Sequence, residues 1–304
     1  MDIRWPGLPY EQWAETRDTL HLWTQVIGKV KLALTPFLNE WWNVAFILTS
    51  RGMTTGPMPS GPADLQIDVD FIIQQLVLAT SDGRRAFIDL VPRSVAEFHA
   101  AVTMQLRALG CAVTYSTVPS EVPDLVPFEL DTADWAYDGA AARRWWLAML
   151  SVGRVMDRFR TPFGGKSSPV LFYWGGFDLN HTRFSGRPAP ARPGGGVIRA
   201  YGEDQENFAI GFWPGNSASP HAVIYAYLSP APAGVETIRP DPPQARWVPG
   251  VGEFVLPWDE LLASTDPDAA ALGFFASTYA RATALAGWDH SALELPRIPE
   301  REAS

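Results

Sequence analysis

Residues 20–37 read LHLWTQVIGKVKLALTPF, and the architecture of the chain can be inferred from them. Trp23, Ile27 and Val30 are spaced by four and three residues, which places their side chains in one stripe along a helix. Pro36 cannot continue that helix, because its ring obstructs the preceding turn and it has no backbone N–H to donate. The pattern therefore predicts a helix that ends near this proline.

A second stretch of the same character follows at residues 143–163, RRWWLAMLSVGRVMDRFRTPF. Its apolar residues have the same helical spacing, and it also ends at a proline, Pro162. Each of the two helices is followed by segments with strand patterns and then by a further helical segment, residues 97–110 in the first copy and 271–287 in the second. We expect an internal duplication in which each copy has the order helix, antiparallel strands, helix.

The strands of the first copy have clear signatures. LQIDVDFI, at residues 65–72, alternates apolar and polar residues, which is typical of a strand with one buried face. QLVLATSDGRRAFIDL, at residues 75–90, is typical of a hairpin with its turn at residues 81–83. The strand segments of the second copy are separated by long connections rich in proline and glycine, at residues 186–196 and 231–252. Loops of this length are either disordered or functional lids.

The predicted fold class is α+β, with two helix, antiparallel-meander, helix repeats that are related by an approximate twofold axis and packed as one globular unit. The expected boundaries are 1–118 for the first repeat, 119–138 for an extended proline-rich strap, 139–290 for the second repeat and 291–304 for a loose tail. A functional site is expected in the cleft between the repeats, because such clefts often hold ligands.

Composition and charge argue against several classes of protein. The chain has 304 residues, of which 47% are hydrophobic and 19% charged, and this is enough to build a large core. The net charge of −9 argues against a nucleic-acid partner, because phosphate backbones are normally bound by basic surfaces. The single cysteine, Cys111, excludes an intrachain disulfide and a zinc site made of thiolates.

The sequence lacks the patterns of membrane helices, secretory signals, metal sites and cofactor-binding loops. No apolar run approaches the roughly 18 residues of a membrane helix, and the first residues lack the pattern of a secretory signal. We therefore expect a cytoplasmic protein without a membrane partner. The five histidines lack the spacing of metal ligands, and no nucleotide-binding loop or nucleophile elbow occurs in its required context. The sequence thus predicts neither a metal nor a cofactor, and it leaves the oligomeric state open.

Specific motifs occur along nearly the whole chain: WPGLPYEQW at 5–13, NEWWNV at 39–44, IDVDF at 67–71, PRSVAEF at 92–98 and GKSSPVLFYWGGFDLNHTRFSG at 165–186. With the helix at residues 19–36, they resemble a bacterial family known as domain of unknown function number 5996. The resemblance implies a soluble bacterial protein of this size. It implies no catalytic residues, because the family has no established activity, so the chemistry is argued from the residues themselves.

A polar stripe follows the first predicted helix. His21, Gln25 and Lys29 are four residues apart and project from one face, opposite Trp23 and Val30. This stripe is either ordinary surface or the wall of a cavity. In a cavity, a histidine can move a proton at neutral pH, and a desolvated lysine can bind an anion or act as a base. We expect His21 and Lys29 to be catalytic and Gln25 to bind substrate.

The densest polar cluster lies in the second copy and contains Lys166, Asp178, His181, Arg183 and Ser185. If this segment is extended, His181 and Arg183 share one face and Asp178 points to the other. One interpretation is an aspartate–arginine pair that fixes a loop. In the other interpretation, Arg183 and Lys166 hold a carboxylate or phosphate, and Asp178 is a catalytic orienting or acidic group.

Thirteen tryptophans are far more than a chain of this length usually contains. Core packing is their ordinary role, because large rings bury much apolar area. The other role is to form the walls of a pocket for a flat or cationic ligand. We expect Trp42 and Trp174 to bind substrate in this second way.

The resulting hypothesis is a cofactor-independent enzyme that uses general acid/base chemistry on a small anionic or aromatic molecule. The alternative is a non-catalytic protein that binds or senses a small molecule, and it needs the aromatic pocket but no titrating base. A third interpretation is an interaction protein that presents its proline-rich loops to a partner, which would require a large exposed apolar patch. The sequence specifies neither the substrate nor the reaction class.

Overall fold

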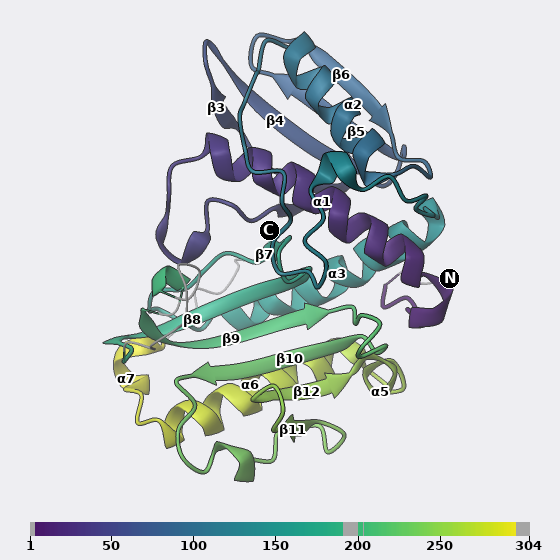
Figure 1. Cartoon of the computed structure of the whole chain (residues 1–304). Helices are drawn as coiled ribbons and strands as arrows, with labels where there is room; N and C mark the ends of the chain where they lie inside the picture. Colours follow the sequence, from purple (N-terminus) through teal and green to yellow (C-terminus); the bar gives the residue numbers. More distant parts are fainter. Residues whose placement is uncertain (1–3, 191–199, 203, 296–304) are drawn as a thin grey trace, which may run out of the picture. The chain divides into compact units, whose positions relative to one another are not determined.

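The computed structural model describes residues 4–190, 200–202 and 204–295, which form two compact units (Figure 1). Unit 1 comprises Met1–Leu150, Leu171–Asp178 and Pro214–His221. Unit 2 comprises Ser151–Val170, Leu179–Trp213 and Ala222–Ser304. Helices and antiparallel sheets occur in both units, so the protein is α+β, as the sequence predicts.

Unit 1 contains a long helix, α1 (Ala14–Leu34), and a sheet with the order β1-β2-β4-β5-β6, in which β3 pairs with β4. All pairings in this sheet are antiparallel. Its strands are β1 (Ile47–Thr49), β2 (Gly52–Thr54), β3 (Met58–Ser60), β4 (Ala63–Asp70), β5 (Gln75–Thr80) and β6 (Arg85–Asp89). The helix α2 (Val95–Ala108) follows the sheet, and Figure 1 shows it along β5 and β6.

The remaining elements of unit 1 are short: the 3-10 turns η1 (Tyr10–Gln12), η2 (Asn39–Trp41) and η3 (Phe128–Leu130), and the strand β7 (Leu171–Tyr173). β7 pairs with the residue before β1, because Phe46 N donates to Phe172 O at 2.8 Å and Phe172 N donates to Phe46 O at 2.9 Å. The strap, residues 119–138, contains η3 and is otherwise irregular. Figure 1 shows the strap crossing α1.

Two elements continue from unit 1 into unit 2: α3 (Gly139–Arg160) and β8 (Asp178–Pro188). Within unit 2 the strand order is β11-β12-β10-β9-β8, again antiparallel, and α6 packs against β9 and β10. The further elements are β9 (Gln205–Trp213), β10 (Val223–Ser229), η4 (Val235–Thr237), β11 (Arg246–Val248), β12 (Glu253–Pro257), α5 (Trp258–Leu262), α6 (Pro267–Leu285) and α7 (His290–Leu293).

The four helices predicted from periodicity are confirmed as α1, α2, α3 and α6, and the predicted hairpin turn joins β5 to β6. In that turn Gly83 has a φ of 93°, a conformation that a glycine adopts without the steric cost of a Cβ atom. The strands β2, β3 and β11 were not predicted, because three residues are too few to show a period. Residues 191–196 of the long connection at 186–196, for which the sequence leaves disorder and a lid as alternatives, and residues 296–304 of the predicted tail lie outside the described residues.

Both units follow the order helix, strands, helix that the sequence predicts, whereas the twofold relation between the repeats stays a prediction.

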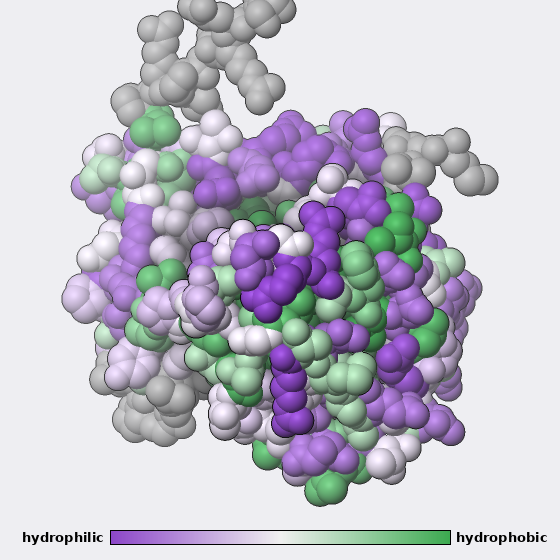
Figure 2. Space-filling view, turned by 90° about the horizontal axis from the view of Figure 1, so that it is seen from above, coloured by the Kyte–Doolittle hydropathy of each residue, from purple (hydrophilic) through white to green (hydrophobic). Residues whose placement is uncertain are grey.

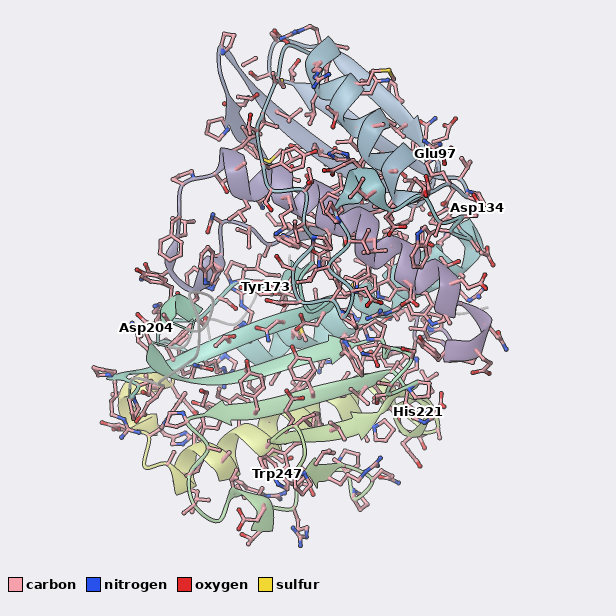
Figure 3. All side chains as sticks on the ribbon, viewed as in Figure 1. Glu97, Asp134, Tyr173, Asp204, His221 and Trp247 are labelled. Atoms are coloured by element: carbon pink, nitrogen blue, oxygen red, sulfur yellow. The ribbon has the colours of Figure 1, made fainter. Side chains whose placement is uncertain are left out.

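The helix boundaries follow from local chemistry. Ser94 and Glu97 form a capping box at the start of α2, in which the Ser94 side chain accepts from Glu97 N at 3.1 Å and Glu97 Oε2 accepts from Ser94 N at 2.9 Å. Figure 3 shows Glu97 at this end of α2.

Aromatic side chains fill the core of unit 1. The Trp23 ring stacks on Phe98 with centroids 4.6 Å apart, and it lies 5.2 Å from the Tyr137 ring of the strap. Trp145 is fully buried and stacks on Phe177 at 4.7 Å. Such contacts bury large apolar areas and add a specific ring geometry. The stripe that contains Trp23 therefore faces the core, and the ordinary packing role holds for these tryptophans.

Exposed apolar side chains such as Phe87, Val91 and Met104 occur on unit 1. Figure 2 shows hydrophobic residues (green) interspersed with hydrophilic ones (purple) on the face seen from above. Scattered apolar residues of this kind are normal on protein surfaces.

Among the helices of the described residues, none has the length and apolar character needed to cross a membrane.

Candidate functional site

The polar stripe on α1 is buried in the structure. His21 is 7% exposed, Gln25 is fully buried and Lys29 is 8% exposed. The interpretation of the stripe as ordinary surface is therefore wrong. Two segments of unit 1 that are distant in sequence cover it: the strap at Ser120–Glu121 and the turn at Trp174–Phe177 that follows β7.

Gln25 holds the strap through its side-chain amide. Gln25 Nε2 donates to Ser120 O at 2.7 Å, and Gln25 Oε1 accepts from Ser120 N at 3.0 Å. Gln25 Nε2 also donates to Trp174 O at 3.3 Å. The amide thus satisfies both backbone groups of Ser120 in the way that a neighbouring strand would, and it links the strap to the turn.

His21 lies beside the turn. Its Nε2 is 2.9 Å from Gly175 O, and its ring is 4.9 Å from the Phe177 ring. A carbonyl oxygen only accepts, so Nε2 carries the proton and Nδ1 carries the lone pair. Burial lowers the pKa of His21 to about 4, and the positive charge of Arg17 contributes to this lowering, although the backbone carbonyls oppose it. The imidazole is therefore neutral at pH 7.

Lys29 is the cation of the stripe. Its ammonium group donates to Ser120 Oγ at 2.6 Å and lies 5.8 Å from the centre of the Trp174 ring. In the described part of the chain, no carboxylate lies within 4.0 Å of this ammonium group. Burial lowers the pKa of Lys29, and the nearby Glu121 opposes that shift. Among the described residues, Ser120 Oγ thus takes one of the three N–H donors of this ammonium group.

Glu121 is an acidic residue whose charge acts on that of Lys29. The Glu121 backbone has a φ of 60°, which is uncommon for a residue with a side chain. Its carboxylate is packed over Gly175: a Cβ atom added to Gly175 would be 2.5 Å from Glu121 Oε2. Desolvation raises the pKa of Glu121 and the charge of Lys29 lowers it, with a net increase. The residue as a whole keeps exposed area, so the carboxylate lies at the rim of the buried stripe.

Trp174 forms one wall of the site. Its indole lies on Gly28 so closely that an added Cβ atom would be 2.2 Å from Trp174 Cε2. Trp174 Nε1 donates to Val44 O at 2.9 Å, which fixes the orientation of the ring. Gly28 is therefore required for the close approach of this indole to the helix.

Asp178 and Trp42, also predicted as site residues, both lie in unit 1, and Asp178 directly follows the turn at Trp174–Phe177 that covers the stripe. Asp178 Oδ1 would be 2.8 Å from a Cβ atom on Gly176, so the carboxylate folds back over the turn. Trp42 is half-buried and follows η2. Tyr173, labelled in Figure 3, lies near η2, with its hydroxyl 3.5 Å from Glu40 O. The contacts of the stripe thus group His21, Gln25, Lys29 and Trp174.

Arg183 belongs to unit 2 and is 2% exposed. Its guanidinium donates to Phe159 O near the end of α3 and lies over three aromatic rings, with its Cζ 3.5 Å from the centre of Phe159, 4.3 Å from Tyr279 and 4.8 Å from Phe163. Burial lowers the pKa of Arg183 to about 10. Carbonyls at a helix end lack helical partners, so this arginine stabilises the end of α3.

Lys166 also belongs to unit 2, and its ammonium group lies 4.5 Å from the centre of the Phe184 ring. Consecutive residues of a strand point to opposite faces of the sheet, so Phe184 and Arg183 face opposite sides of β8. Lys166 and Arg183 are therefore not brought together around one anion. The predicted extension of this segment is confirmed, since β8 pairs with β9 through these residues.

Unit 2 also has a partly open pocket of about 150 Å³. It is lined by Glu206, Leu228, Ser229, Pro230, Ala231, Pro232, Ala286 and Trp288. None of the predicted site residues is among them. In the described ranges, no group of three or more histidine, cysteine, aspartate or glutamate side chains could hold a metal ion.

Ser120 and Lys31 make polar contacts that the sequence did not predict, and Glu121 is a further residue near Lys29 that it did not predict. Lys31 is 6% exposed and donates to Ala45 O, and burial lowers its pKa to about 8. The strap residues carry no periodic pattern, and Lys31 resembles any surface lysine in the sequence. Two signals in the sequence indicated that something covers this face: the mixture of histidine, amide and lysine in one stripe, and the interruption of the face by Gly28 and Leu32.

The contribution of the Gln25 hydrogen bonds to the position of the strap can be tested by mutation. Changing Gln25 to alanine is expected to lower the free energy of unfolding by about 2 kcal/mol, because Ser120 N and O lose their partners in a partly buried place. Hydrogen exchange of the strap amides should accelerate with it. Gln105, a half-buried glutamine of α2, gives the matched control Gln105→Ala. Equal exchange rates in Gln25→Ala and wild type would contradict this role.

Comparison with known proteins gives a family and no function. Neither the curated proteins nor the solved structures include a match to the chain. One family model, described as a family of unknown function (DUF5996), matches residues 5–295, which include α1, the strap and the turn after β7. The chain therefore belongs to the family of unknown function DUF5996.

Proposed function

We propose that unit 1 binds a small organic anion on the polar stripe of α1, beneath the strap. The observation that carries this proposal is the state of Lys29, a buried ammonium group with one protein acceptor and no carboxylate within 4.0 Å among the described residues. A buried charge is costly unless a partner compensates it. An anion beside Lys29 would supply that partner.

The groups around Lys29 suit such a ligand. The side-chain amide of Gln25 becomes a free donor when its hydrogen bond to Ser120 of the strap breaks. The Nε2–H of His21 is a neutral donor on the same face of α1. Trp174 presents its indole 5.8 Å from the Lys29 ammonium group, which suits an apolar or flat portion next to the anionic group. Hydrogen bonds from an ammonium to a carboxylate are among the stronger ones in proteins.

Catalysis on the bound anion is a second candidate function, favoured by the opposite pKa shifts of Lys29 and Glu121. Burial lowers the pKa of the lysine and raises that of the glutamate, which brings an acid and a base nearer to neutrality. His21, with its pKa of about 4, is poorly matched to proton transfer at neutral pH. This favours binding over the proton-carrier role expected for His21. Uptake of deuterium from heavy water into a bound ligand would support catalysis.

The binding proposal is tested with the Lys29→Gln variant, which removes the charge and keeps a polar side chain of similar reach. Wild-type protein is titrated calorimetrically with acetate, propionate, benzoate and inorganic phosphate. We expect at least one of these anions to bind, and its affinity to fall about tenfold or more in Lys29→Gln, since a charge-assisted hydrogen bond contributes about 1.5–3 kcal/mol. Arg85→Gln removes an exposed positive charge from the same unit and is the control. If Arg85→Gln weakens binding equally, the proposed site is wrong.

A further inference from the structure

A serine hydroxyl lies directly beside the buried amine of α1. Ser120 Oγ is 2.6 Å from Lys29 Nζ, a distance at which a nucleophile can pass its proton to a base. Lys29 is 8% exposed, and in the described part of the chain no carboxylate lies within 4.0 Å of its Nζ. Ser120 is half-buried, so it is the more accessible member of the pair.

The backbone holds Ser120 in place without using its hydroxyl. Both backbone groups of Ser120 bond to the Gln25 amide, at 2.7 and 3.0 Å, and this leaves Oγ to Lys29. The next residue, Glu121, has a φ of 60°, and its N–H has no acceptor among the described residues. Backbone conformations of this uncommon kind cluster at functional sites.

We propose that Ser120 and Lys29 are the nucleophile and the general base of an activity that hydrolyses esters of small organic acids. The proposal rests on the site of the proposed function and goes beyond the binding of an anion there, because it names the class of substrate from which the anion would come. A serine hydroxyl is a weak nucleophile until a neighbouring base takes its proton, and lysine is one of the bases that enzymes use for this purpose.

The surroundings of the pair suit an uncharged substrate. Burial lowers the pKa of Lys29, which increases the share of neutral amine at a given pH, although the charge of Glu121 opposes this shift. A neutral Lys29 accepts the Ser120 proton along the same 2.6 Å contact. The Trp174 indole lies 5.8 Å from Lys29 Nζ and offers an apolar wall for an acyl group.

The reaction proceeds through an acyl group on Ser120. Oγ bonds to the acyl carbon while Lys29 takes the hydroxyl proton, and the alcohol then leaves with that proton as its bond to the acyl carbon breaks. Water attacks the acyl carbon and gives a proton to Lys29, which passes it to Oγ as the bond between Oγ and carbon breaks. The released acid gives its own proton to Lys29. The product is therefore a carboxylate beside an ammonium group, and the Glu121 N–H is a donor for the oxyanion of each tetrahedral intermediate.

The experiment follows the hydrolysis of p-nitrophenyl acetate, propionate and benzoate by the full chain, with acid-quenched samples digested for mass spectrometry. In wild type we expect an acyl group on Ser120 and a rate that rises with pH as Lys29 loses its proton. Ser120→Ala and Lys29→Gln should each lower the rate above the uncatalysed reaction about 100-fold, because a general base contributes about 100-fold or more. Ser120→Ala keeps both backbone bonds to Gln25, so the strap should stay in place.

The matched controls remove a serine and a lysine elsewhere. Ser116→Ala changes an exposed serine close to the strap, and Lys166→Gln changes a half-buried lysine of unit 2. Both should hydrolyse the esters at the wild-type rate. If Ser120→Ala hydrolyses them as fast as wild type, or if the acyl group is found on other residues and not on Ser120, the proposed pair is refuted.

The outcomes also separate this inference from the proposed function. If acetate, propionate or benzoate binds wild type and binding depends on Lys29, but Ser120 is not acylated, the site binds anions and the hydrolytic activity is overturned. If Ser120 is acylated and the ester is hydrolysed while none of the anions binds, the activity stands and the binding function is overturned. If neither is observed, both are overturned.

Discussion

Replacing Gly28 by alanine is expected to lower the free energy of unfolding of unit 1 by about 3 kcal/mol. The new Cβ atom would be 2.2 Å from Trp174 Cε2 and 2.3 Å from Cδ2, so the indole must move as a rigid group. Overpacking of this kind costs about 1–3 kcal/mol or more, and loss of the Trp174 Nε1 bond to Val44 O adds about 1 kcal/mol. The gain in helix propensity offsets up to about 1 kcal/mol.

The matched control is Gly273→Ala in α6. A Cβ atom at Gly273 would meet nothing within 4 Å, so only the helix propensity changes and the variant should be more stable by up to about 1 kcal/mol. Urea unfolding followed by circular dichroism and by tryptophan fluorescence measures both variants. Each substitution should shift the transition of its own unit. A neutral or stabilising effect of Gly28→Ala would show that Trp174 does not pack on α1.

The close approach of Trp174 also links the fold to the candidate site. The indole and the Lys29 ammonium group are neighbours, and Gln25 donates to the backbone oxygen of Trp174. A displaced indole would therefore change the position of the turn at Gly175, which accepts from His21 and supports Glu121. For this reason we expect Gly28→Ala to weaken any anion binding in addition to its effect on stability.

Periodicity predicted the direction of the side chains on α1 but not their partners. A spacing of four residues places His21, Gln25 and Lys29 on one face whatever surrounds the helix. Their partners, Ser120 and Gly175, are separated from them in sequence by 91 to 154 residues. Such contacts depend on where an irregular strap and a tight turn pass. Neither has a repeating pattern from which a position can be inferred.

The cluster in the second copy shows a different limit of the sequence. Alternation on β8 correctly placed His181 and Arg183 on one face, because the period of a strand is independent of its neighbours. The sequence could not show that this face is sealed by Phe159, Phe163 and Tyr279 from two helices and a loop. Charged residues that gather in a sequence can therefore serve the core of the fold, as Arg183 does at the end of α3.

Acidification from pH 7 to pH 4 is expected to remove about 3 kcal/mol of stability through His21. Its pKa in the folded protein is about 4, whereas the ordinary pKa of a histidine, which applies to the unfolded chain, is 6.5. Between these values the unfolded chain binds a proton on this imidazole that the folded chain does not, so the free energy of unfolding falls as the pH falls. The loss begins near pH 6.5 and is nearly complete near pH 4. The difference between the two pKa values corresponds to about 3 kcal/mol.

His21→Gln isolates this contribution, because a glutamine can still donate to Gly175 O but does not titrate. The stability difference between wild type and variant should shrink or reverse by about 3 kcal/mol between pH 7 and pH 4, whereas His181 affects both proteins equally and cancels. His221→Gln, at an exposed histidine of the same unit that Figure 3 labels, controls for removing an imidazole. If the stability difference between wild type and His21→Gln stays constant across this range, His21 accepts a proton in the folded protein as readily as in the unfolded chain. The polar stripe would then be more open to water than the structure shows.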